Sequence, residues 1–201
     1  MDTDSPLLAA LADDLDRSFE ALVAAHQDRL YSIALRMLGD PRDAEEAAQD
    51  ALIRAYRALA GYDRERIEAL RLRPWLATIV LNLCRNRLAR RPGAGRVLAP
   101  LSLDAALPGD VEPHAKGTAD PAASASVRAA AHDWAGLLMT LPAAYRSAIV
   151  LRHVDGLSYP EIAIALHRPE GTVKAQVHRG LALLRTAFEA AQRLEREEMT
   201  T

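Results

Sequence analysis

The stretch LPAAYRSAIVLRHVDGLSYPEIAIALHRPEGTVKAQVHRGLALLR, residues 141–185, decides the fold of the C-terminal half of the chain. A Leu-Pro pair and a later Asp-Gly pair delimit a first helix over about 142–154. Ser158-Tyr159-Pro160-Glu161 is a capping box that begins a short helix over 159–166. After a His-Arg-Pro turn, a longer helix is expected from about Glu170 to Ala187 or beyond. Two short helices joined by a tight turn predict a helix-turn-helix.

The last helix of this stretch has an apolar face and a basic face. Its apolar residues recur at i, i+4, i+8 and i+11 and are expected to be buried: Val173, Val177, Leu181 and Leu184. In a recognition helix, Lys and Arg hydrogen-bond to guanine, while Thr or Ala contacts the thymine methyl group. The candidates for such contacts are Thr172, Lys174, Ala175, His178 and Arg179. An ordinary solvated amphipathic helix has the same pattern, so composition alone leaves both interpretations open.

A second basic stretch, residues 71–91, ends the N-terminal helical part of the chain. It contains six arginines and no acid, with Trp75, Asn82 and Asn86 between them. Arg side chains bind phosphates, and Asn and aromatic side chains can hydrogen-bond to exposed bases or stack on them. The arginines therefore predict a nucleic-acid surface, whereas Trp75 alone is better explained as a core residue.

The segment that follows residue 39 has the opposite charge. Asp40 is a suitable N-cap before Pro41, and the helix that begins there is expected to end near Leu59, before Gly61. The first half of this helix is acidic: Asp43, Glu45, Glu46 and Asp50. Acids near a helix N-terminus interact favourably with the helix dipole and need no partner, so composition favours that simple explanation.

The two helical parts flank a stretch of different composition. Residues 92–126 contain nine Pro and Gly residues among small and polar ones, which is typical of a linker. We therefore predict an all-α protein with two small helical domains joined by a flexible linker. The expected division is an N-terminal extension 1–16, a helical domain 17–91, a linker 92–126, a helix-turn-helix domain 127–190 and a tail 191–201.

The composition also argues against several classes of protein. The chain has 201 residues, a formal net charge of −2 and one cysteine, Cys84, which fits a reducing cytoplasm. Its N-terminus lacks the basic region of a signal peptide, and no apolar run reaches the roughly 18 residues of a membrane span. We expect a cytoplasmic protein without membrane insertion. The six histidines show no metal-site spacing and there is no glycine-rich phosphate loop, so no enzyme, metal or cofactor is predicted.

Three stretches, 19–59, 73–91 and 141–185, resemble regions 2 and 4 of the extracytoplasmic-function (ECF) sigma factors, which direct bacterial RNA polymerase to promoters. The first resembles the family pattern D-A-E-D-x-x-Q-E, and the second the pattern W-L-x-x-I-A-x-N. The third contains G-L-S-Y-x-E-I-A and G-T-V-K. Two departures concern promoter specificity: the segment 62–75 is longer than the usual loop, and Ala175-Gln176 replaces the common Ser-Arg pair.

The resemblance implies a role for each set of candidate residues. The acidic helix would bind core RNA polymerase through Asp43, Glu46, Gln49, Asp50 and Ile53. The downstream (−10) promoter element would be bound by Trp75, Asn82, Arg85 and Asn86. The upstream (−35) element would be bound as duplex DNA by Arg168, Thr172, Lys174, Ala175, His178 and Arg179.

The resemblance also implies a regulatory partner, because factors of this family are commonly held inactive by an anti-sigma factor that covers regions 2 and 4. The main alternative is a helix-turn-helix transcriptional regulator whose N-terminal helices sense a ligand or dimerise. The segment 19–91 favours the sigma factor, because it matches a polymerase-binding region and shows no ligand-pocket pattern.

Overall fold

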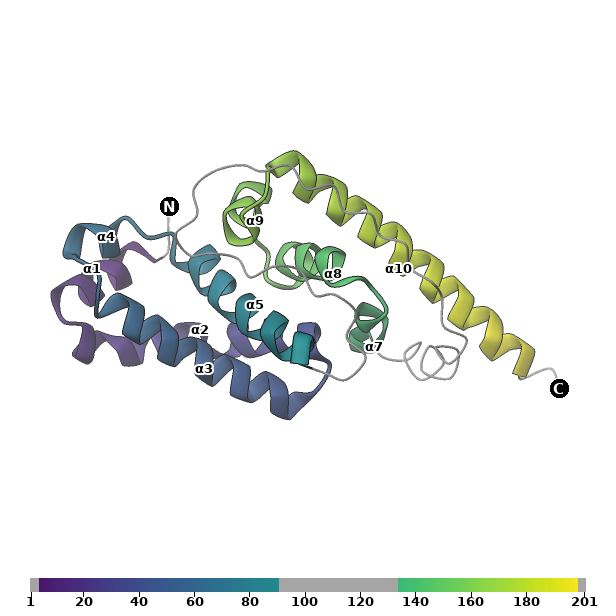
Figure 1. Ribbon diagram of the computed structural model, residues 1–201, viewed down its shortest axis with the longest axis horizontal. Coiled ribbons are helices and arrows are strands. Elements are labelled where there is room, and N and C mark those ends of the chain that lie inside the picture. Colours follow the sequence, from purple (N-terminus) through teal and green to yellow (C-terminus); the bar gives the residue numbers. More distant parts are fainter. Residues whose placement is uncertain (1–3, 91–133, 199–201) are drawn as a thin grey trace.

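The computed structural model describes residues 4–90 and 134–198, and every regular element in these two ranges is a helix (Figure 1). We call residues 4–90 the first module; it contains α1 (Ser5–Asp13), α2 (Leu15–Leu38), α3 (Pro41–Leu59), α4 (Arg64–Glu68) and α5 (Leu72–Arg90). We call residues 134–198 the second module; it contains α7 (Trp134–Met139), α8 (Ala143–Ile149), the π-helical segment η1 (Val150–Val154), α9 (Tyr159–Leu166) and α10 (Glu170–Glu198). The all-α prediction is confirmed, and the predicted linker 92–126 lies outside the described residues.

The first module is a bundle in which α2, α3 and α5 pack against one another. Gly39 ends α2 with φ of 73°, a left-handed conformation that glycine adopts without steric cost. Asp40 then caps α3, because its carboxylate accepts a 2.9 Å hydrogen bond from the backbone N–H of Asp43. The buried face of α3 is almost entirely alanine, which lets α3 approach α2 closely: Ala44, Ala47, Ala48, Ala51 and Ala55.

The second module contains the predicted helix-turn-helix. The capping box is present, since the backbone N–H of Ser158 donates to the Glu161 carboxylate at 2.7 Å and the Ser158 hydroxyl accepts from the backbone N–H of Glu161. His167 ends α9 in the left-handed region with φ of 49°. The next helix, α10, begins at Glu170 as predicted and continues to Glu198.

The predicted buried face of α10 was wrong at one position. Val173, Val177 and Leu184 are buried, but Leu181 is 42% exposed. A 3.6-residue repeat rotates position i+8 away from the line through i and i+4, so the buried position between Val177 and Leu184 is Gly180. A Cβ atom at Gly180 would lie 2.6 Å from Ile149 Cδ1, which shows how closely α10 crosses α8.

The two modules pack against each other. In Figure 1, α9 lies beside α5, and α2 also contacts η1 and α7. The apolar core is continuous across the two modules. None of the helices in the described ranges combines the length and apolar character that crossing a membrane requires.

Candidate polymerase and nucleic-acid interfaces

The first turns of α10 carry an exposed polar surface. Of the predicted upstream-element residues, Thr172, Lys174, His178 and Arg179 are exposed and Ala175 is half-buried. Lys174 forms a 2.7 Å ion pair with Glu170, an exposed i,i+4 pair whose contribution to stability is small. The structure therefore brings these five residues together at one end of the second module, where a DNA groove could reach them.

Arg168, the sixth predicted upstream-element residue, precedes this surface in the chain and is less exposed. It is half-buried in the turn between α9 and α10, and burial lowers the pKa of its guanidinium. Its neighbour across the module boundary is Arg85 of α5, a predicted downstream-element residue that is only 3% exposed. Burial, followed by the charge of Arg168, lowers the pKa of Arg85 to about 10.

The other predicted downstream-element residues have different environments. Trp75 and Asn82 are half-buried, and Asn86 is exposed. The indole of Trp75 lies 6.3 Å from the ring of Tyr62, measured between centroids, so it packs partly within the first module as composition suggested. The face of α5 that carries Arg85 is covered by the second module, whereas Asn86 remains accessible.

The acidic helix α3 presents the predicted polymerase-binding residues. Glu46, Gln49 and Ile53 are exposed, and Ile53 is 48% exposed although it is a large apolar side chain. The remaining two, Asp43 and Asp50, are half-buried. The five residues therefore form one polar and apolar strip along α3.

Sequence reasoning missed the partner of this strip on α5. The guanidinium of Arg87 donates to Glu46 at 2.9 Å and to Asp50 at 2.8 Å, and the hydrogen bond to Glu46 contributes most to raising its pKa. The sequence did contain a signal for this pairing, because the helix over 41–59 is acidic and the stretch over 71–91 is basic. At least one of the six arginines in the basic stretch therefore pairs with acids of α3 and is not simply solvated.

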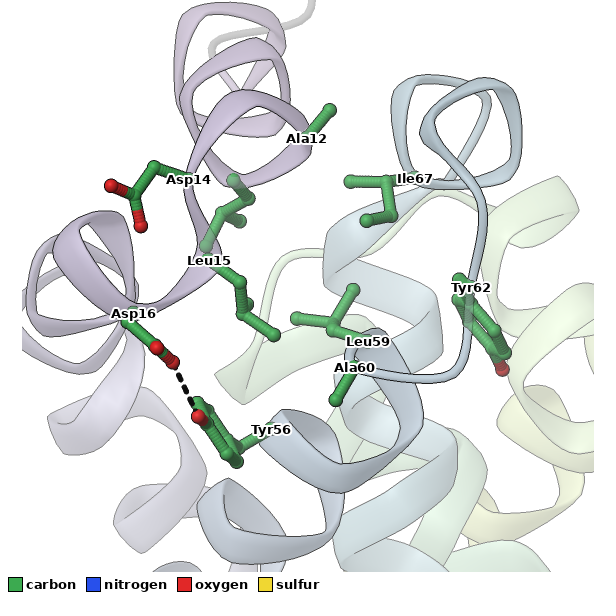
Figure 2. A pocket seen from close by; sticks show the side chains of 10 residues that line it. Ala12, Asp14, Leu15, Asp16, Tyr56, Leu59, Ala60, Tyr62 and Ile67 are labelled. Carbon is green, nitrogen blue, oxygen red and sulfur yellow. Dashed lines mark hydrogen bonds between the residues drawn. The ribbon is translucent and has the colours of Figure 1, made fainter.

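An open pocket of about 420 Å³ lies near the C-terminal end of α3 (Figure 2). Its walls come from α1, α2, α3 and the segment around α4, with Leu15, Leu59 and Ile67 among the apolar side chains that line it. The Tyr56 hydroxyl donates a 2.5 Å hydrogen bond to the Asp16 carboxylate at the pocket edge. The pocket continues the partly apolar strip of α3, since Tyr56 is 37% exposed.

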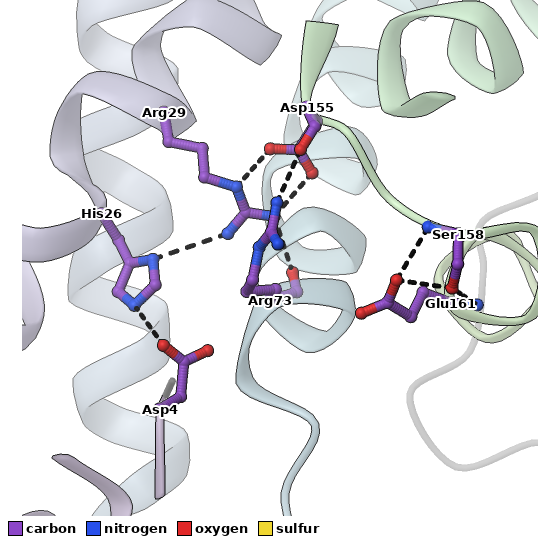
Figure 3. Close-up of polar contacts among 7 residues, drawn as sticks. All are labelled: Asp4, His26, Arg29, Arg73, Asp155, Ser158 and Glu161. Carbon is purple, nitrogen blue, oxygen red and sulfur yellow. Dashed lines mark hydrogen bonds and ion pairs between the residues drawn. The ribbon is translucent and has the colours of Figure 1, made fainter. Parts of the chain in front are cut away.

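A polar cluster joins the two modules (Figure 3). The carboxylate of Asp155, whose side chain is fully buried, accepts hydrogen bonds from Nε and Nη2 of Arg29, the second at 2.5 Å. Arg73 donates to the backbone carbonyl oxygen of Asp155 at 2.6 Å. His26 lies beside Arg29, and burial contributes most to lowering its pKa. The contacts of Asp155 with Arg29 and Arg73 were not predicted, because no local pattern relates residues so far apart in the chain.

Two further hydrogen bonds cross the same boundary. The hydroxyl of Thr78 on α5 has one proton and two acceptors, the backbone carbonyl oxygen of Pro74 at 2.9 Å and, across the boundary, that of Ala165 on α9 at 3.1 Å. The guanidinium of Arg146 on α8 donates to the backbone carbonyl oxygen of Met37 at 2.7 Å, near the end of α2. Because all these groups are buried or half-buried, the packing of the modules is specific and is not only apolar contact.

Two family models match the two modules. The model for Sigma-70 region 2 matches residues 22–92, and the model for Sigma-70, region 4 matches residues 133–184. ECF RNA polymerase sigma factor SigW of Bacillus subtilis is 32% identical over 168 residues, covering 84% of this chain and 87% of that protein. ECF RNA polymerase sigma factor SigE of Mycolicibacterium smegmatis is 33% identical over 168 residues, but the chain spans only 60% of its length.

A solved structure has the same arrangement of helices. The structure of CnrH in complex with the cytosolic domain of CnrY matches with a TM-score of 0.66 and 25% identity, covering 93% of this chain and 97% of CnrH. The chain is thus a sigma factor, a transcription initiation factor that directs promoter-specific transcription. Within that class it belongs to the extracytoplasmic-function group of the sigma-70 family. Within the described ranges, no group of three or more His, Cys, Asp or Glu side chains is arranged to hold a metal ion.

Proposed function

We propose that this sigma factor binds core RNA polymerase through the exposed strip of α3 and binds promoter DNA through α5 and the start of α10. The observation that carries the proposal is the joint exposure of Thr172, Lys174, His178 and Arg179 on the helix after the turn. Lys and Arg at such positions can bind guanine and phosphate in a major groove. The upstream promoter element is accordingly assigned to the second module.

The polymerase contact is assigned to Asp43, Glu46, Gln49, Asp50 and Ile53. Interfaces commonly combine an apolar centre with a polar rim, and the half-exposed Ile53 among acids and amides fits that description. The ion pairs of Arg87 with Glu46 and Asp50 hold the acidic side chains in place on the α3 surface. A basic surface of the polymerase is the complementary partner that this charge favours.

The downstream promoter element is assigned to Trp75, Asn82, Arg85 and Asn86. Arg85 is nearly fully covered by the second module, so this surface becomes complete only when the two modules separate. An anti-sigma partner is expected to shift the equilibrium between packed and separated modules. CnrH was solved in complex with the cytosolic domain of CnrY, so a similar fold does bind a protein partner.

A charge reversal on α3 tests the polymerase assignment. The double substitution Gln49→Arg, Asp50→Arg leaves Glu46 available to Arg87 and is expected to weaken binding to core polymerase at least about tenfold. Affinity of the free chain for duplex DNA should not fall. Glu65→Arg, an exposed change on α4, is the control for added positive charge, with a charge change of +2 against +3 in the double variant. Unchanged core affinity of the double variant, or an equal weakening of core and DNA binding, would contradict the assignment.

A further inference from the structure

The polar cluster between the modules has an asymmetric charge. On the first module, Arg29 and Arg73 converge on one point, and Arg29 Nη2 also lies 3.5 Å from the Arg73 carbonyl oxygen. We call these two side chains the arginine cradle. Its occupant, the Asp155 carboxylate, comes from the second module and is held by two N–H groups of one guanidinium. Arginine binds carboxylates and phosphates with the same two-pronged geometry.

The acids near the cradle come mainly from the second module. Burial acts to raise the pKa of Glu161, but hydrogen bonds from Ser158 and the nearby charges of Arg73 and Arg71 lower it. Glu161 and Asp155 therefore both face arginines of the first module. On the first module itself, Asp4 lies 4.0 Å from His26 Nε2 and contacts the histidine rather than the cradle.

Separation of the modules would remove both of these acids at once. It would leave Arg29 and Arg73, which lie together in Figure 3, without Asp155, and it would uncover Arg85 farther along α5. From Arg73 to Arg85 the helix rises about 18 Å, at about 1.5 Å per residue. Trp75 and Asn82 lie within this length of α5, but about half a turn around the helix from Arg73. Basic groups that bind the backbone of a strand, with an aromatic side chain on the same helix, are typical of a surface for single-stranded nucleic acid.

We propose that the arginine cradle is a binding site for a backbone phosphate of single-stranded promoter DNA, and that Asp155 occupies this site when the modules are packed together. The second module thus competes with DNA for the same two guanidinium groups. This inference rests on the proposed promoter-binding function of α5, and it adds a site to it. Asp155 acts as a stand-in for the phosphate, so the packed arrangement and DNA binding exclude each other.

The test uses the full chain and a labelled, mixed-sequence single-stranded oligonucleotide, with affinity measured by anisotropy over a range of salt concentrations. Asp155→Asn is expected to raise affinity several-fold, because the neutral amide binds the cradle less well. Thr78→Val, which removes another hydrogen bond between the modules, should also raise affinity, as a matched control for opening. If the Asp155→Asn variant binds DNA no better than the unmodified chain, the proposal that Asp155 competes with DNA for the arginine cradle is wrong.

The decisive comparison is made in the opened background. Adding Arg29→Gln to Asp155→Asn should reduce affinity about tenfold and lower the slope of log affinity against log salt by about 0.7, the value for one phosphate contact on a single strand. Arg29→Lys should keep the slope and only part of the affinity, since it keeps the charge without the two-pronged geometry. Circular dichroism and thermal melting establish that each variant is folded.

The outcomes distinguish a DNA-binding role of Arg29 from a purely structural role in holding the modules together. If Arg29 only holds the modules together, the double variant will bind DNA as tightly as Asp155→Asn, and the proposal is wrong. An effect seen with duplex DNA but not with the single strand would also overturn it. Failure of the unmodified chain to direct specific initiation with core polymerase would instead contradict the proposed function, so the two failures can be distinguished.

Discussion

Gly180→Ala tests how α10 packs on α8 within the second module. The added Cβ would lie 2.6 Å from Ile149 Cδ1, 3.1 Å from Tyr145 Cβ and 3.3 Å from Ile149 Cγ1. The first distance is shorter than real contacts allow, so Ile149 must move or α10 must shift. Overpacking of this kind typically costs about 1–3 kcal/mol, and the better helix propensity of alanine returns about 1 kcal/mol. We therefore expect a net loss of stability of up to about 2 kcal/mol.

A double-mutant cycle separates these two effects. Ile149→Val removes the Cδ1 atom that the new methyl group would meet, so in that background Gly180→Ala should be close to neutral or stabilising. Gly171→Ala is the matched control, because a Cβ there meets nothing within 4 Å. Urea unfolding gives each free energy. Equal effects of Gly180→Ala with and without Ile149→Val would refute the argument that close packing of α10 on α8 requires glycine.

Three other predictions concern single side chains. Burial lowers the pKa of His26, so the unfolded chain binds more protons below its ordinary pKa of 6.5, and stability should fall as pH drops through that value. His26→Gln should weaken this pH dependence in unfolding experiments, and an unchanged dependence would contradict it. Burial raises the pKa of the Cys84 thiol to about 12, so it should react with a thiol reagent far more slowly in the native chain than in urea. Replacing Lys174 or Arg179 with Ala should make the slope of log affinity for duplex DNA against log salt concentration less steep, by about 0.9 for each phosphate that the side chain neutralises. An unchanged slope would mean that the residue does not contact a DNA phosphate.

Local patterns predicted the ends of several helices, because cap and turn signals lie within a few residues, but they did not predict α1, which lies in the expected N-terminal extension. The capping box of Ser158 and Glu161 and the N-cap Asp40 act on backbone groups three positions away, and both are present. The error at Leu181 came from extending an i+4 step too far along α10. The buried face of a helix shifts slightly around its axis with each i+4 step. This shift is hard to detect in the sequence when a glycine, rather than an apolar residue, occupies the buried position.

The contacts between the modules could not be predicted in this way. Asp155 belongs to an Asp-Gly pair that is typical of a helix end, and its partner Arg29 lies in a different module. The resemblance to the family assigned Arg85 to promoter DNA, but whether Arg85 is accessible depends on α9, which follows a long stretch of intervening sequence. Charge and spacing indicate which residues can bind DNA, whereas only the packing of the modules shows which of them are accessible.

The packed modules contain both a favourable and an unfavourable charge contact, and together these affect the free energy needed to separate the modules. Asp155 neutralises Arg29, but Arg85 and Arg168 face each other while Arg85 is buried, and the lowered pKa of Arg85 means that its charge costs the packed state a few kcal/mol. If packed and separated modules were populated 99:1, a ligand would have to bind the separated state about 5.5 kcal/mol more tightly to reverse that ratio. Under the proposed assignment, binding of DNA to Arg29 and Arg85 would supply free energy only to the open state, whereas α3 is exposed in the packed state, so polymerase binding to α3 alone would favour neither state. The burial of Arg85 beside Arg168 therefore reduces the differential binding that promoter DNA must provide to separate the modules.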